Sequence, residues 1–515
     1  MTSLRRHTGM LLMLVGLAVD GSAAPPPVLT SDALVRHVTR FNAMEDEHYT
    51  NTLSNAQAVA WMQTEIPRFE CPDAEVEEMY FYRWWSFRKH LVRTPAGWII
   101  TEFLTPVGHA DVFNAISCAT GFHVAEGRWL RDQSYVDDYL RFWFRGNQGG
   151  PQKKLHGFSS WIPAAAYDRC LVTGDNKPAV DLLDDFIAEY HFWERERQAT
   201  NGLYWQFDVR DGMEESISGS RTNRNLRPTI NSYMFANARA IAALALAAKR
   251  PEVAADFQRK ADTLQQLTQE TLWDAQAKFF KVRRPDGVFS TAREAVGFVP
   301  WMFGLPSARL DSGAAWAQLL DAEGFAAPFG VTTAERRHPQ FRSHGVGTCE
   351  WDGAVWPFAT CQTLYALGNV LQDYPPVGLS RSDYLDAFLT YVHSQHAGGK
   401  PYIGEYLDEV TGDWINGKNN RSRYYNHSTF ADLLITGIVG LRPQAADVVE
   451  VNPLLPDETW DWFCLDGVKY HGRELTILWD TDGTRYRRGQ GLMIFADGKE
   501  IARATSLSKL SGKLP

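Results

Sequence analysis

Apolar residues recur at spacings of three and four through most of the chain, from about residue 109 to residue 443. This is the period of an α-helix, and the candidate helices come in consecutive pairs joined by loops that alternate between short and long. They cover residues 111–125, 133–144, 161–172, 177–195, 231–249, 252–273, 356–371, 382–393 and 428–441. Many paired helices in one domain predict an (α/α) toroid, a closed ring in which long loops at one end carry the chemistry. A two-domain helical bundle is the alternative.

The regions on either side of this helical domain have other patterns. Residues 25–108 are expected to form a lead-in of helix and short strands. Over residues 444–505, short apolar runs alternate with Asp-Gly turns, which predicts a small antiparallel β module. Residues 506–515 have neither pattern and are expected to be a loose tail. The predicted fold class is therefore mainly α, with the β module at the C-terminal end.

The first 24 residues have the composition of a secretory signal peptide. Arg5 and Arg6 form a basic end, an apolar run follows over residues 9–19, and small residues over 21–24 suit a cleavage site. The apolar run is too short to span a bilayer as a helix. We therefore expect a periplasmic or secreted mature protein that does not contact a membrane. Retention of the segment as an uncleaved anchor is the alternative.

The net charge and the aromatic content bear on the kind of ligand. A formal charge of −9 argues against a nucleic-acid partner, and less strongly against a polyanionic substrate, because both require basic patches. Aromatic residues make up 13% of the chain and include 18 Trp, whose rings stack on sugars, although most are expected in the core. The six cysteines lack the spacing of a zinc site, so neither a metal nor another cofactor is expected. Cys349 is expected to be a buried free thiol.

Two acidic clusters, each among glycine and aromatic residues, stand far apart in the chain at Gly212–Ser216 and Ile403–Trp414. Hydrolysis of a glycosidic bond requires two carboxyl groups on opposite sides of a sugar. One protonates the leaving oxygen, and the other activates water or attacks carbon. Clusters so distant can face each other only if the helices close into a ring. The pattern therefore predicts a carbohydrate-cleaving site between them, with a solvated acidic loop as the alternative for the first cluster.

Each cluster offers one favoured carboxyl group. Glu214 and Glu215 are adjacent, so only one of them can face a pocket, and an acid at this place would need a raised pKa. Glu405 lies between Tyr402 and Tyr406, where it is less solvated than a carboxylate in a charge run. Glu405 is therefore the favoured base, and the other acidic residues of its cluster are expected in a surface turn.

Several further residues are of types that bind sugars. Asn231 carries an amide that can hydrogen-bond to a hydroxyl group, and Tyr406 is an aromatic neighbour of the favoured base. Trp351 and Trp356 could form a stacking platform ahead of a helix that carries Gln362. Packing at the start of that helix is the alternative for Trp356.

The order of these motifs resembles that of the (α/α)6-barrel glycoside hydrolases of the trehalase and processing α-glucosidase clan, families 37 and 63. It is more similar still to the bacterial mannosylglycerate-hydrolase-like domains of that clan. The matching segments are Gly212–Ser216, Asn231–Ala240, Trp351–Trp356, Glu405–Gly412 and Gly437–Pro443. The resemblance implies an (α/α)6 barrel in which Glu214 occupies the position of the general acid and Glu405 that of the base. It also implies that Trp129, Arg131 and Asp132 bind the terminal sugar, with an exposed ion pair as the alternative for the last two.

Two departures from that pattern limit what can be carried over. The family has Asp at the position of Glu214, and the extra methylene keeps Asp211 and Glu215 open as the acid. Residues 423–433 differ from the aromatic-rich segment of the glucosidases, so substrate specificity is not carried over. Similar helical domains occur in plant-polysaccharide enzymes, including the family 142 β-L-arabinofuranosidases, and a relation to that family stays open.

The resulting hypothesis is an exo-acting, inverting glycoside hydrolase, in which Glu214 is the acid and Glu405 the base. A polysaccharide lyase is an alternative, because one segment contains the residue types that such enzymes use, Arg423, Tyr424, Asn426 and His427. A structural role at a helix start is nevertheless favoured for His427. A glycoside phosphorylase and a non-catalytic sugar-binding protein are further alternatives. The sequence leaves the sugar, the anomer, the linkage and the oligomeric state open.

Overall fold

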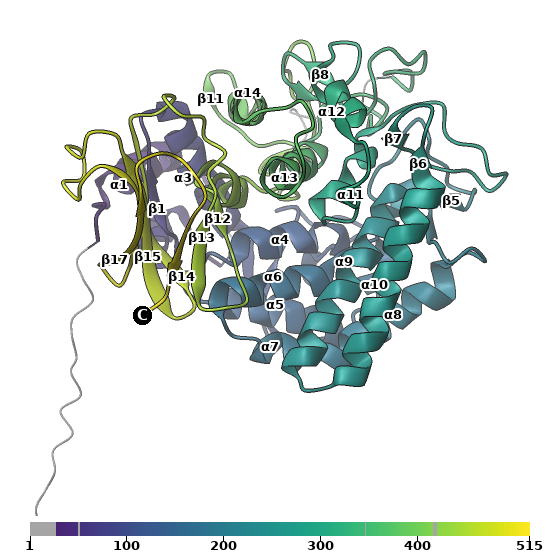
Figure 1. Ribbon diagram of the computed structural model, residues 1–515, viewed down its shortest axis with the longest axis horizontal. Coiled ribbons are helices and arrows are strands. Elements are labelled where there is room, and N and C mark those ends of the chain that lie inside the picture. The colour runs from purple at the N-terminus through teal and green to yellow at the C-terminus, as the bar shows by residue number, and fades with distance from the viewer. Residues whose placement is uncertain (1–26, 50–51, 346, 416–419) are drawn as a thin grey trace, which may run out of the picture.

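The computed structural model describes residues 27–49, 52–345, 347–415 and 420–515, and Figure 1 shows them as a large helical domain beside a smaller β module. The predicted signal peptide lies outside the described residues. Within the described part of the chain, no helix combines the length and the apolar character that a bilayer crossing requires.

The helical domain is a closed ring of paired helices. In the described residues, six inner helices each contact the next, and the last contacts the first. They are α4 (Thr120–Gly127), α6 (Ile162–Thr173), α9 (Pro228–Ala247), α11 (Val299–Met302), α13 (Pro357–Asp373) and α15 (Ala431–Leu433). Around them lie α5 (Ser134–Arg145), α8 (Leu183–Arg197), α10 (Pro251–Leu272), α12 (Gly313–Leu320), α14 (Arg381–Ser394) and α3 (Ala74–Lys89). The predicted (α/α)6 toroid is therefore confirmed.

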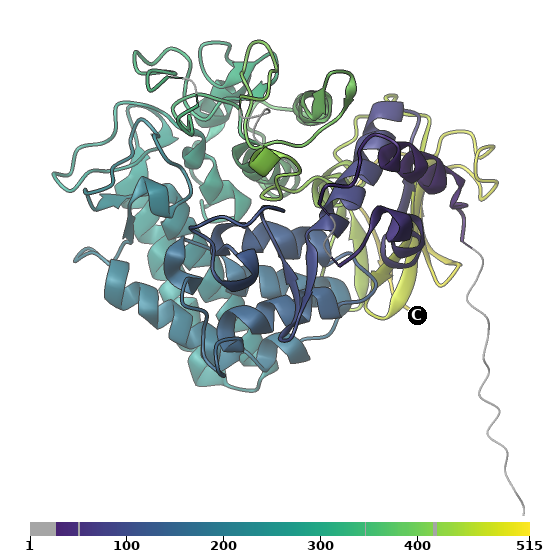
Figure 2. The same ribbon diagram turned by 180° about the vertical axis from the view of Figure 1, so that it is seen from behind.

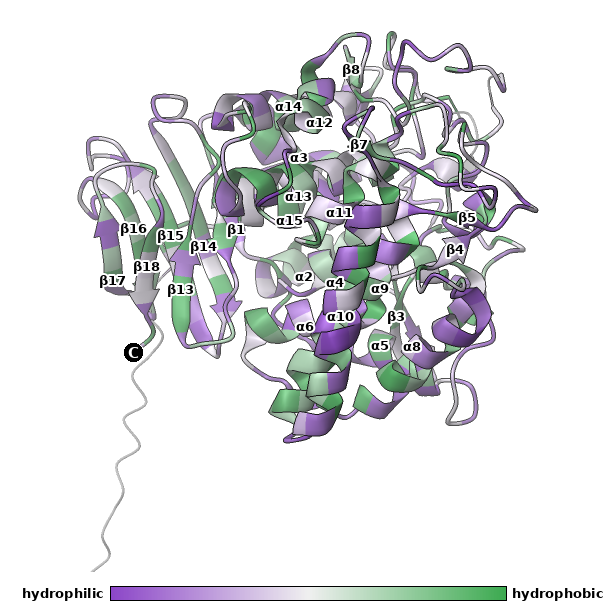
Figure 3. Ribbon diagram, turned by 45° about the vertical axis from the view of Figure 1, so that its right-hand side comes forward, coloured by the Kyte–Doolittle hydropathy of each residue, from purple (hydrophilic) through white to green (hydrophobic). Residues whose placement is uncertain are grey.

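The pair α9 and α10 shows how the sequence separates inner from outer helices. Most residues of α9 are buried on every side, as expected for a helix enclosed by neighbours. On α10, the buried residues follow the spacing of one face and include Ala254, Phe257, Ala261 and Leu264. Figure 3 shows this helix in the foreground, with polar and apolar residues alternating along it.

Three predicted helices differ from the structure. Residues 177–195, predicted as one helix, are divided into α7 (Lys177–Val180) and α8. The helix predicted over 111–125 begins only with α4 at Thr120 and is preceded by short 3-10 turns, because Phe113 and Asn114 have φ values of 57° and 64° that no right-handed helix accepts. The helix predicted over 428–441 is reduced to α15 followed by a π-helical turn, Leu434–Ile438.

Small elements complete the helical domain. Helices α1 (Asp32–Asn42) and α2 (Ala58–Glu65) cover α3, and α7 (Lys177–Val180) precedes α8. Short antiparallel hairpins occur in the connections: β2–β3 (Leu91–Thr94, Gly97–Ile100), β4–β5 (Trp205–Gln206, Asn225–Leu226), β6–β7 (Trp273–Asp274, Phe279–Phe280), β8–β9 (Ala326–Ala327, Gly330–Val331) and β10–β11 (His396–Ala397, Lys400–Pro401).

The C-terminal module contains two antiparallel sheets. The larger has the order β1-β14-β15-β16-β17, and the smaller has the order β12-β13-β18. Their strands are β1 (Arg68–Glu70), β14 (Trp462–Tyr470), β15 (Arg473–Asp480), β16 (Gly491–Ala496), β17 (Lys499–Ala504), β12 (Leu441–Arg442), β13 (Val448–Val451) and β18 (Leu510–Lys513). Figure 2 shows the two sheets beside the N-terminal helices.

Strand pairing changes two domain boundaries that the sequence predicted, one at the lead-in and one at the C-terminal tail. Strand β1 belongs to the lead-in but pairs with β14, so the lead-in and the C-terminal module share one sheet. Strand β18 lies inside the predicted loose tail, and that prediction is wrong because β18 pairs along its whole length with β13. Backbone pairing to a distant strand, which no local pattern reveals, orders these last residues.

The module is fixed to the toroid by polar contacts at the ends of α4 and α6. Arg131 forms an ion pair with Glu474 at 3.1 Å, and its other terminal nitrogen donates to the carbonyl of Gly467 at 3.2 Å. The backbone N–H of His471 donates to the carbonyl of Val172 at 3.1 Å.

The ring of helices closes through residues 424–432, here called the closing segment. The carboxylate of Glu126 on α4 accepts the backbone N–H groups of Phe430, Ala431 and Asp432, which are the free donors at the start of α15. Arg128 and the indole of Trp129 both reach Asp432, at 2.8 and 2.6 Å. Buried charges and helix-end donors therefore join the first inner helix to the last.

The rest of the closing segment is held in the same way. The imidazole of His90 donates to the carbonyl of Tyr424 at 2.7 Å, and that of His123 donates to the carbonyl of Asn426 at 2.6 Å. Arg83 on α3 donates to the carbonyl of Ser428 at 2.6 Å. The segment is thus fixed from both α3 and α4 along its length.

We expect Asp432→Ala to lower the free energy of unfolding by about 3–5 kcal/mol, because it leaves the buried Arg128 guanidinium without its carboxylate. Chemical denaturation followed by circular dichroism measures this loss. Asp184→Ala is the matched control, because it removes a carboxylate that pairs with Arg250 at the surface and should cause a far smaller loss. Equal losses in the two variants would contradict the role of Asp432 in closing the ring.

Candidate active site

Glu214 and Glu405 line one cavity of about 240 Å³, here called the carboxylate cavity. Long loops that connect the helices gather at the end of the ring drawn uppermost in Figure 2. The cavity is lined by Glu102, Phe103, His109, Ile116, Cys118, Phe158, Gly212, Glu214, Cys349, Trp356, Phe358, Glu405, Arg421, Tyr425 and His427. The two acidic clusters that are far apart in sequence are therefore neighbours in space.

Glu214 has the surroundings of a general acid. Gly212, two residues before Glu214, has a φ of 71°, a left-handed conformation that glycine adopts without strain. The residue between them, Met213, is buried. Burial, with a smaller contribution from the nearby carboxylates of Asp208 and Glu405, raises the pKa of Glu214 to about 7. The Glu214 carboxyl is therefore half protonated near neutral pH.

The two other candidates for the acid have different partners. Asp211 is fully buried and accepts hydrogen bonds from Arg227, at 2.6 Å, and from Thr229. Glu215 forms an ion pair with Arg221 at 2.7 Å on the partly exposed side of the loop. Neither residue lines the carboxylate cavity, so Glu214 is the carboxyl group of this cluster that faces it.

Glu405 is held in place from one side. The hydroxyl of Ser422 donates to its Oε2 at 2.7 Å, and the guanidinium of Arg421 lies 3.6 Å from the same oxygen. The residue before it must be glycine, because a Cβ on Gly404 would come within 2.4 Å of the ring of Trp414. Glu405 is thus a buried carboxylate with a fixed orientation and a nearby positive charge.

An aromatic stack supports the same wall. Trp356 stacks between Trp351 and Tyr406, with ring centroids 4.5 and 4.4 Å apart. Trp356 alone of the three lines the carboxylate cavity, so the other two hold its ring in position. Gln362 is buried behind this stack and donates to the hydroxyl of Tyr233 at 2.9 Å. The sugar contacts predicted for Trp351, Tyr406 and Gln362 are therefore replaced by indirect roles.

His427 lines the carboxylate cavity, and only 2% of its surface is exposed. Neither of its ring nitrogens has a hydrogen-bond partner among the described residues. Burial lowers the pKa of its imidazole well below the usual range, and the charge of Arg83 lowers it further. His427 is therefore a neutral group with one donor and one acceptor available to a ligand.

Four residues predicted to contact a sugar do not line the carboxylate cavity, and their polar atoms bond to other parts of the protein. Trp129 is buried against Asp432, and Arg131 joins the β module to the toroid. Asp132 accepts the N–H of Ser134 at 2.9 Å, beside the start of α5. Asn231 holds the backbone of Tyr204 through both amide atoms, each at 2.8 Å. Structural roles therefore replace the predicted contacts of these four residues with a sugar.

The cavity also contains residues that the sequence did not identify, chiefly Glu102, Tyr425, Arg421 and Cys118. Glu102 lies just after β3, and nothing in its local sequence distinguishes it from a surface carboxylate. Tyr425 stands beside His427, and a tilted ring contact with a centroid distance of 3.7 Å joins the two. Cys349 lines the cavity as a half-buried free thiol.

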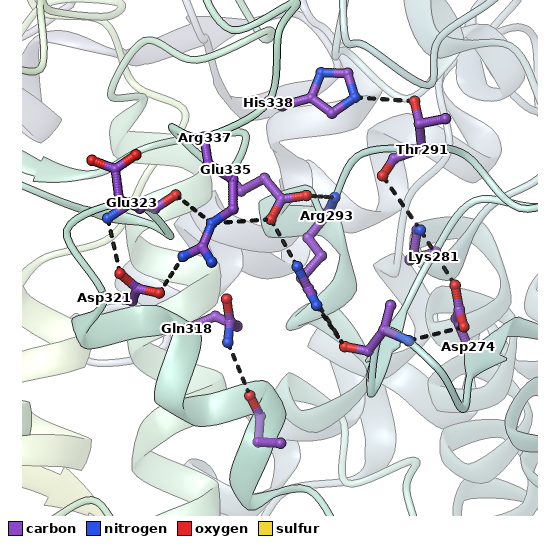
Figure 4. A network of polar contacts seen from close by, with 12 residues as sticks. Asp274, Lys281, Thr291, Arg293, Gln318, Asp321, Glu323, Glu335, Arg337 and His338 are labelled. Carbon is purple, nitrogen blue, oxygen red and sulfur yellow. Dashed lines mark hydrogen bonds and ion pairs between the residues drawn. The ribbon is translucent and has the colours of Figure 1, made fainter.

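Figure 4 shows a polar network around Arg293, which directly precedes a residue in contact with the loop of Glu214. Arg293 pairs with Glu335 at 2.8 Å, and Arg337 approaches the same carboxylate at 3.7 Å. Glu294, which directly follows Arg293 in the chain, is buried, and its carboxylate accepts the backbone N–H of Ser218 at 3.2 Å. The network fixes Arg293, and the neighbouring Glu294 in turn holds the loop that contains Glu214.

A larger cavity of about 990 Å³ lies among α6, α9, α10 and α13, with a wall that is mostly apolar and contains neither Glu214 nor Glu405. A neighbouring cavity of about 260 Å³ is lined by Phe122. Phe122 packs edge-on against Phe358, which lines the carboxylate cavity, with centroids 4.8 Å apart. These rings form part of the floor that separates the carboxylate cavity from the two others.

Comparison with known proteins places this geometry in a family. Residues 112–428 match the sequence model of the mannosylglycerate hydrolase MGH1-like glycoside hydrolase domain, and residues 441–503 match that of the glycosyl hydrolase family 65 C-terminal domain. A solved protein titled "Sialidase" is 50% identical over 94% of this chain, with a TM-score of 0.93. The match covers 45% of that protein, so this chain spans less than half of its length.

More distant structures share the fold. The family 63 mannosylglycerate hydrolase from Thermus thermophilus in complex with Tris is 12% identical over 70% of this chain and all of its own, with a TM-score of 0.52. The family 78 rhamnosidase of a Bacillus species is 13% identical over 80% of this chain and 40% of its own, also with a TM-score of 0.52. Because the first sequence model spans more than half of the chain, this chain belongs to the mannosylglycerate hydrolase MGH1-like family of glycoside hydrolases.

Proposed function

We propose that this glycoside hydrolase removes a terminal sugar from an oligosaccharide or polysaccharide with inversion at the anomeric carbon. The observation that carries the proposal is the convergence of Glu214 and Glu405 in one cavity, together with the pKa of about 7 for Glu214. Two carboxyl groups in different surroundings meet the requirement for one acid and one base.

In the proposed reaction, the protonated Glu214 donates its proton to the glycosidic oxygen. Glu405, oriented by Ser422 and balanced by Arg421, takes a proton from a water molecule on the opposite face of the sugar. The oxygen of that water bonds to the anomeric carbon as the bond to the leaving oxygen breaks, and the leaving group departs as an alcohol. Space for the water corresponds to a separation of about 6.5–9.5 Å between the two carboxyl groups.

The size of the cavity supports removal of a single terminal unit. Its volume of about 240 Å³ is below the roughly 300–1,000 Å³ of sites that enclose larger ligands. Phe358 contributes to a closed floor, whereas Arg421 is half-exposed and His109 is exposed. A chain would therefore insert its terminal sugar and leave the remainder on the side of Arg421 and His109.

The alternatives find less support. Tyr424, one of the lyase candidates, donates its hydroxyl to Glu45 and does not line the cavity that contains His427. A phosphorylase needs no base, whereas Glu405 is oriented as one. The longer relative is titled a sialidase, but this chain corresponds to less than half of it. Three carboxyl groups and Arg421 in the cavity suit a neutral sugar better than an anionic one.

We also propose that the protein acts in the periplasm or outside the cell. The signal-like composition of residues 1–24 supports export. Comparing the N-terminal sequence of the protein purified from its native host with the printed sequence tests this, and an intact first segment would contradict cleavage.

We expect Glu405→Gln to lower kcat by about 10²–10⁴-fold on every substrate, because the neutral amide cannot take a proton from water. Glu214→Gln should cause a comparable loss on substrates with poor leaving groups and a much smaller loss on dinitrophenyl glycosides, whose leaving group needs no proton. Glu215→Gln is the matched control and should keep nearly full activity, because Glu215 faces Arg221 outside the cavity. Steady-state kinetics decides, and full turnover by Glu405→Gln would contradict the assignment of the base.

A panel of aryl glycosides and of plant and bacterial glycans, with the first-formed product followed by NMR, tests both the reaction and its stereochemistry. We expect a single sugar to be released with the anomeric configuration opposite to that of the substrate. Retention of configuration would contradict the role of Glu405 as a base. An unsaturated product that absorbs in the ultraviolet would indicate a lyase instead.

We expect kcat/KM to fall as the pH rises through about 7, because Glu214 must be protonated to act and its raised pKa keeps it protonated only below that pH. A pH profile of kcat/KM measures this decline. On a dinitrophenyl glycoside, Glu214→Gln should lose the decline near pH 7. An undiminished kcat/KM of the wild-type enzyme at pH 9 would contradict the assignment of the acid.

A further inference from the structure

The carboxylate cavity contains a third carboxyl group, that of Glu102, which the proposed reaction does not use. Glu102 follows β3, and its side chain is buried, with 3% of the residue exposed. The carboxylates of both Glu405 and Glu214 lie close enough to raise its pKa. A buried carboxyl group beside two others requires an explanation, because unpaired charge in such a place is strongly unfavourable.

The partners of Glu102 are neutral. The hydroxyl of Tyr425 donates to its Oε1, and the thiol of Cys118 lies 3.6 Å from its Oε2. Within the described residues, no lysine, arginine or histidine lies within 4 Å of this carboxyl group in an ion pair. Burial is the main reason that its pKa rises, to about 8.

The balance of charge in the cavity follows from these surroundings. With all three carboxyl groups ionised, Arg421, the one arginine or lysine among the described residues of the cavity wall, would offset only one of their three negative charges. With Glu102 and Glu214 protonated, Glu405 and Arg421 are the charged members of these four, and they lie 3.6 Å apart. The other titratable groups facing Glu102 or the cavity are His109, Cys118, Tyr139, Cys349, Tyr425 and His427. Cys118 and Tyr425 have pKa values raised by burial, and His427 has one lowered by burial, so these three are neutral.

We propose that Glu102 is a sugar-binding residue that acts as a neutral carboxylic acid and, with His427, hydrogen-bonds to the hydroxyl groups of a sugar, in a cavity that takes sugars without a carboxylate. The inference rests on the proposed function and names its substrate class. A protonated carboxyl group has one O–H donor and a carbonyl acceptor, and the neutral imidazole of His427 has one of each. A sugar hydroxyl, itself donor and acceptor, can pair with either group.

A uronic acid or another acidic sugar would be disfavoured in the same cavity. Its carboxylate would lie close to Glu405, and Arg421, the one arginine among the described residues of the cavity wall, already neutralises Glu405. Like charges in a closed space of low dielectric repel strongly. Glu102 and His427 therefore offer hydrogen bonds to a neutral ligand, and neither adds a positive charge that would balance the charge of an anionic one.

The KM of Glu102 variants tests the binding role, measured on the best neutral aryl glycoside of the panel. We expect Glu102→Gln to raise KM by about 3–10-fold with little change in kcat, because an amide replaces one hydrogen bond imperfectly, and Glu102→Ala to raise KM further. Glu215→Gln is the control. A loss in kcat of more than 100-fold in Glu102→Gln would overturn the proposal, because it would require an ionised Glu102 in the chemistry. Thermal unfolding of Glu102→Gln checks that the variant is folded.

The pH dependence of KM provides a readout that a purely structural role would not change. Glu102 is neutral below its raised pKa, so its contact with the sugar should be present below pH 8 and lost above it. We expect the KM of the wild-type enzyme to rise above pH 8 and that of Glu102→Gln to stay level. Parallel KM profiles for the two proteins would overturn the proposal.

Paired substrates separate the failure of this inference from the failure of the proposed function. Aryl glycosides of neutral hexoses and pentoses are compared with the matching aryl uronides, and we expect the uronides to react at least 100-fold more slowly. Hydrolysis of uronides and neutral glycosides at similar rates would overturn the specificity alone, with the hydrolase intact. Absence of hydrolysis with every glycoside and glycan would overturn the proposed function, and this inference with it.

Discussion

The contact between α4 and the start of α15 is the constraint on which the rest of the structure depends. Glu126 takes up the free N–H groups of Phe430, Ala431 and Asp432, and Arg128 and Trp129 hold the carboxylate of Asp432. These charges are buried, so each depends on its partner, and loss of one leaves the other uncompensated. Closing the ring in this way also fixes the segment before α15, which carries Tyr425 and His427 into the cavity.

The same enclosure sets the chemistry of the site. Carboxyl groups that would be ionised in water share a closed space in which each disfavours the charge of the others. Glu214 and Glu102 have raised pKa values, whereas Glu405 is oriented by Ser422 and paired with Arg421. Different surroundings thus set similar side chains apart, which is the basis for proposing one as the acid, one as the base and one as a neutral contact for the sugar.

The comparisons agree with this division between scaffold and site. At 12–13% identity, the ring of helices is still recognisable in the mannosylglycerate hydrolase and the rhamnosidase. A ring of helices requires only apolar residues at the right spacing, which many sequences provide. The chemistry depends on side chains from loops and from the closing segment, so a shared fold leaves the substrate undetermined.

The sequence by itself determined the paired helices and the β module and identified Glu214 and Glu405 as the candidate carboxyl groups, because periodicity and local motifs depend on neighbouring residues. Only the tertiary structure decided which distant residues meet. It places Trp129, Arg131 and Asn231 in contacts within the protein, pairs β18 with β13, and brings Glu102 to the cavity. The physical reason is that burial and charge pairing join residues hundreds of positions apart. A carboxyl group such as Glu102 acquires its environment only when the ring closes around it.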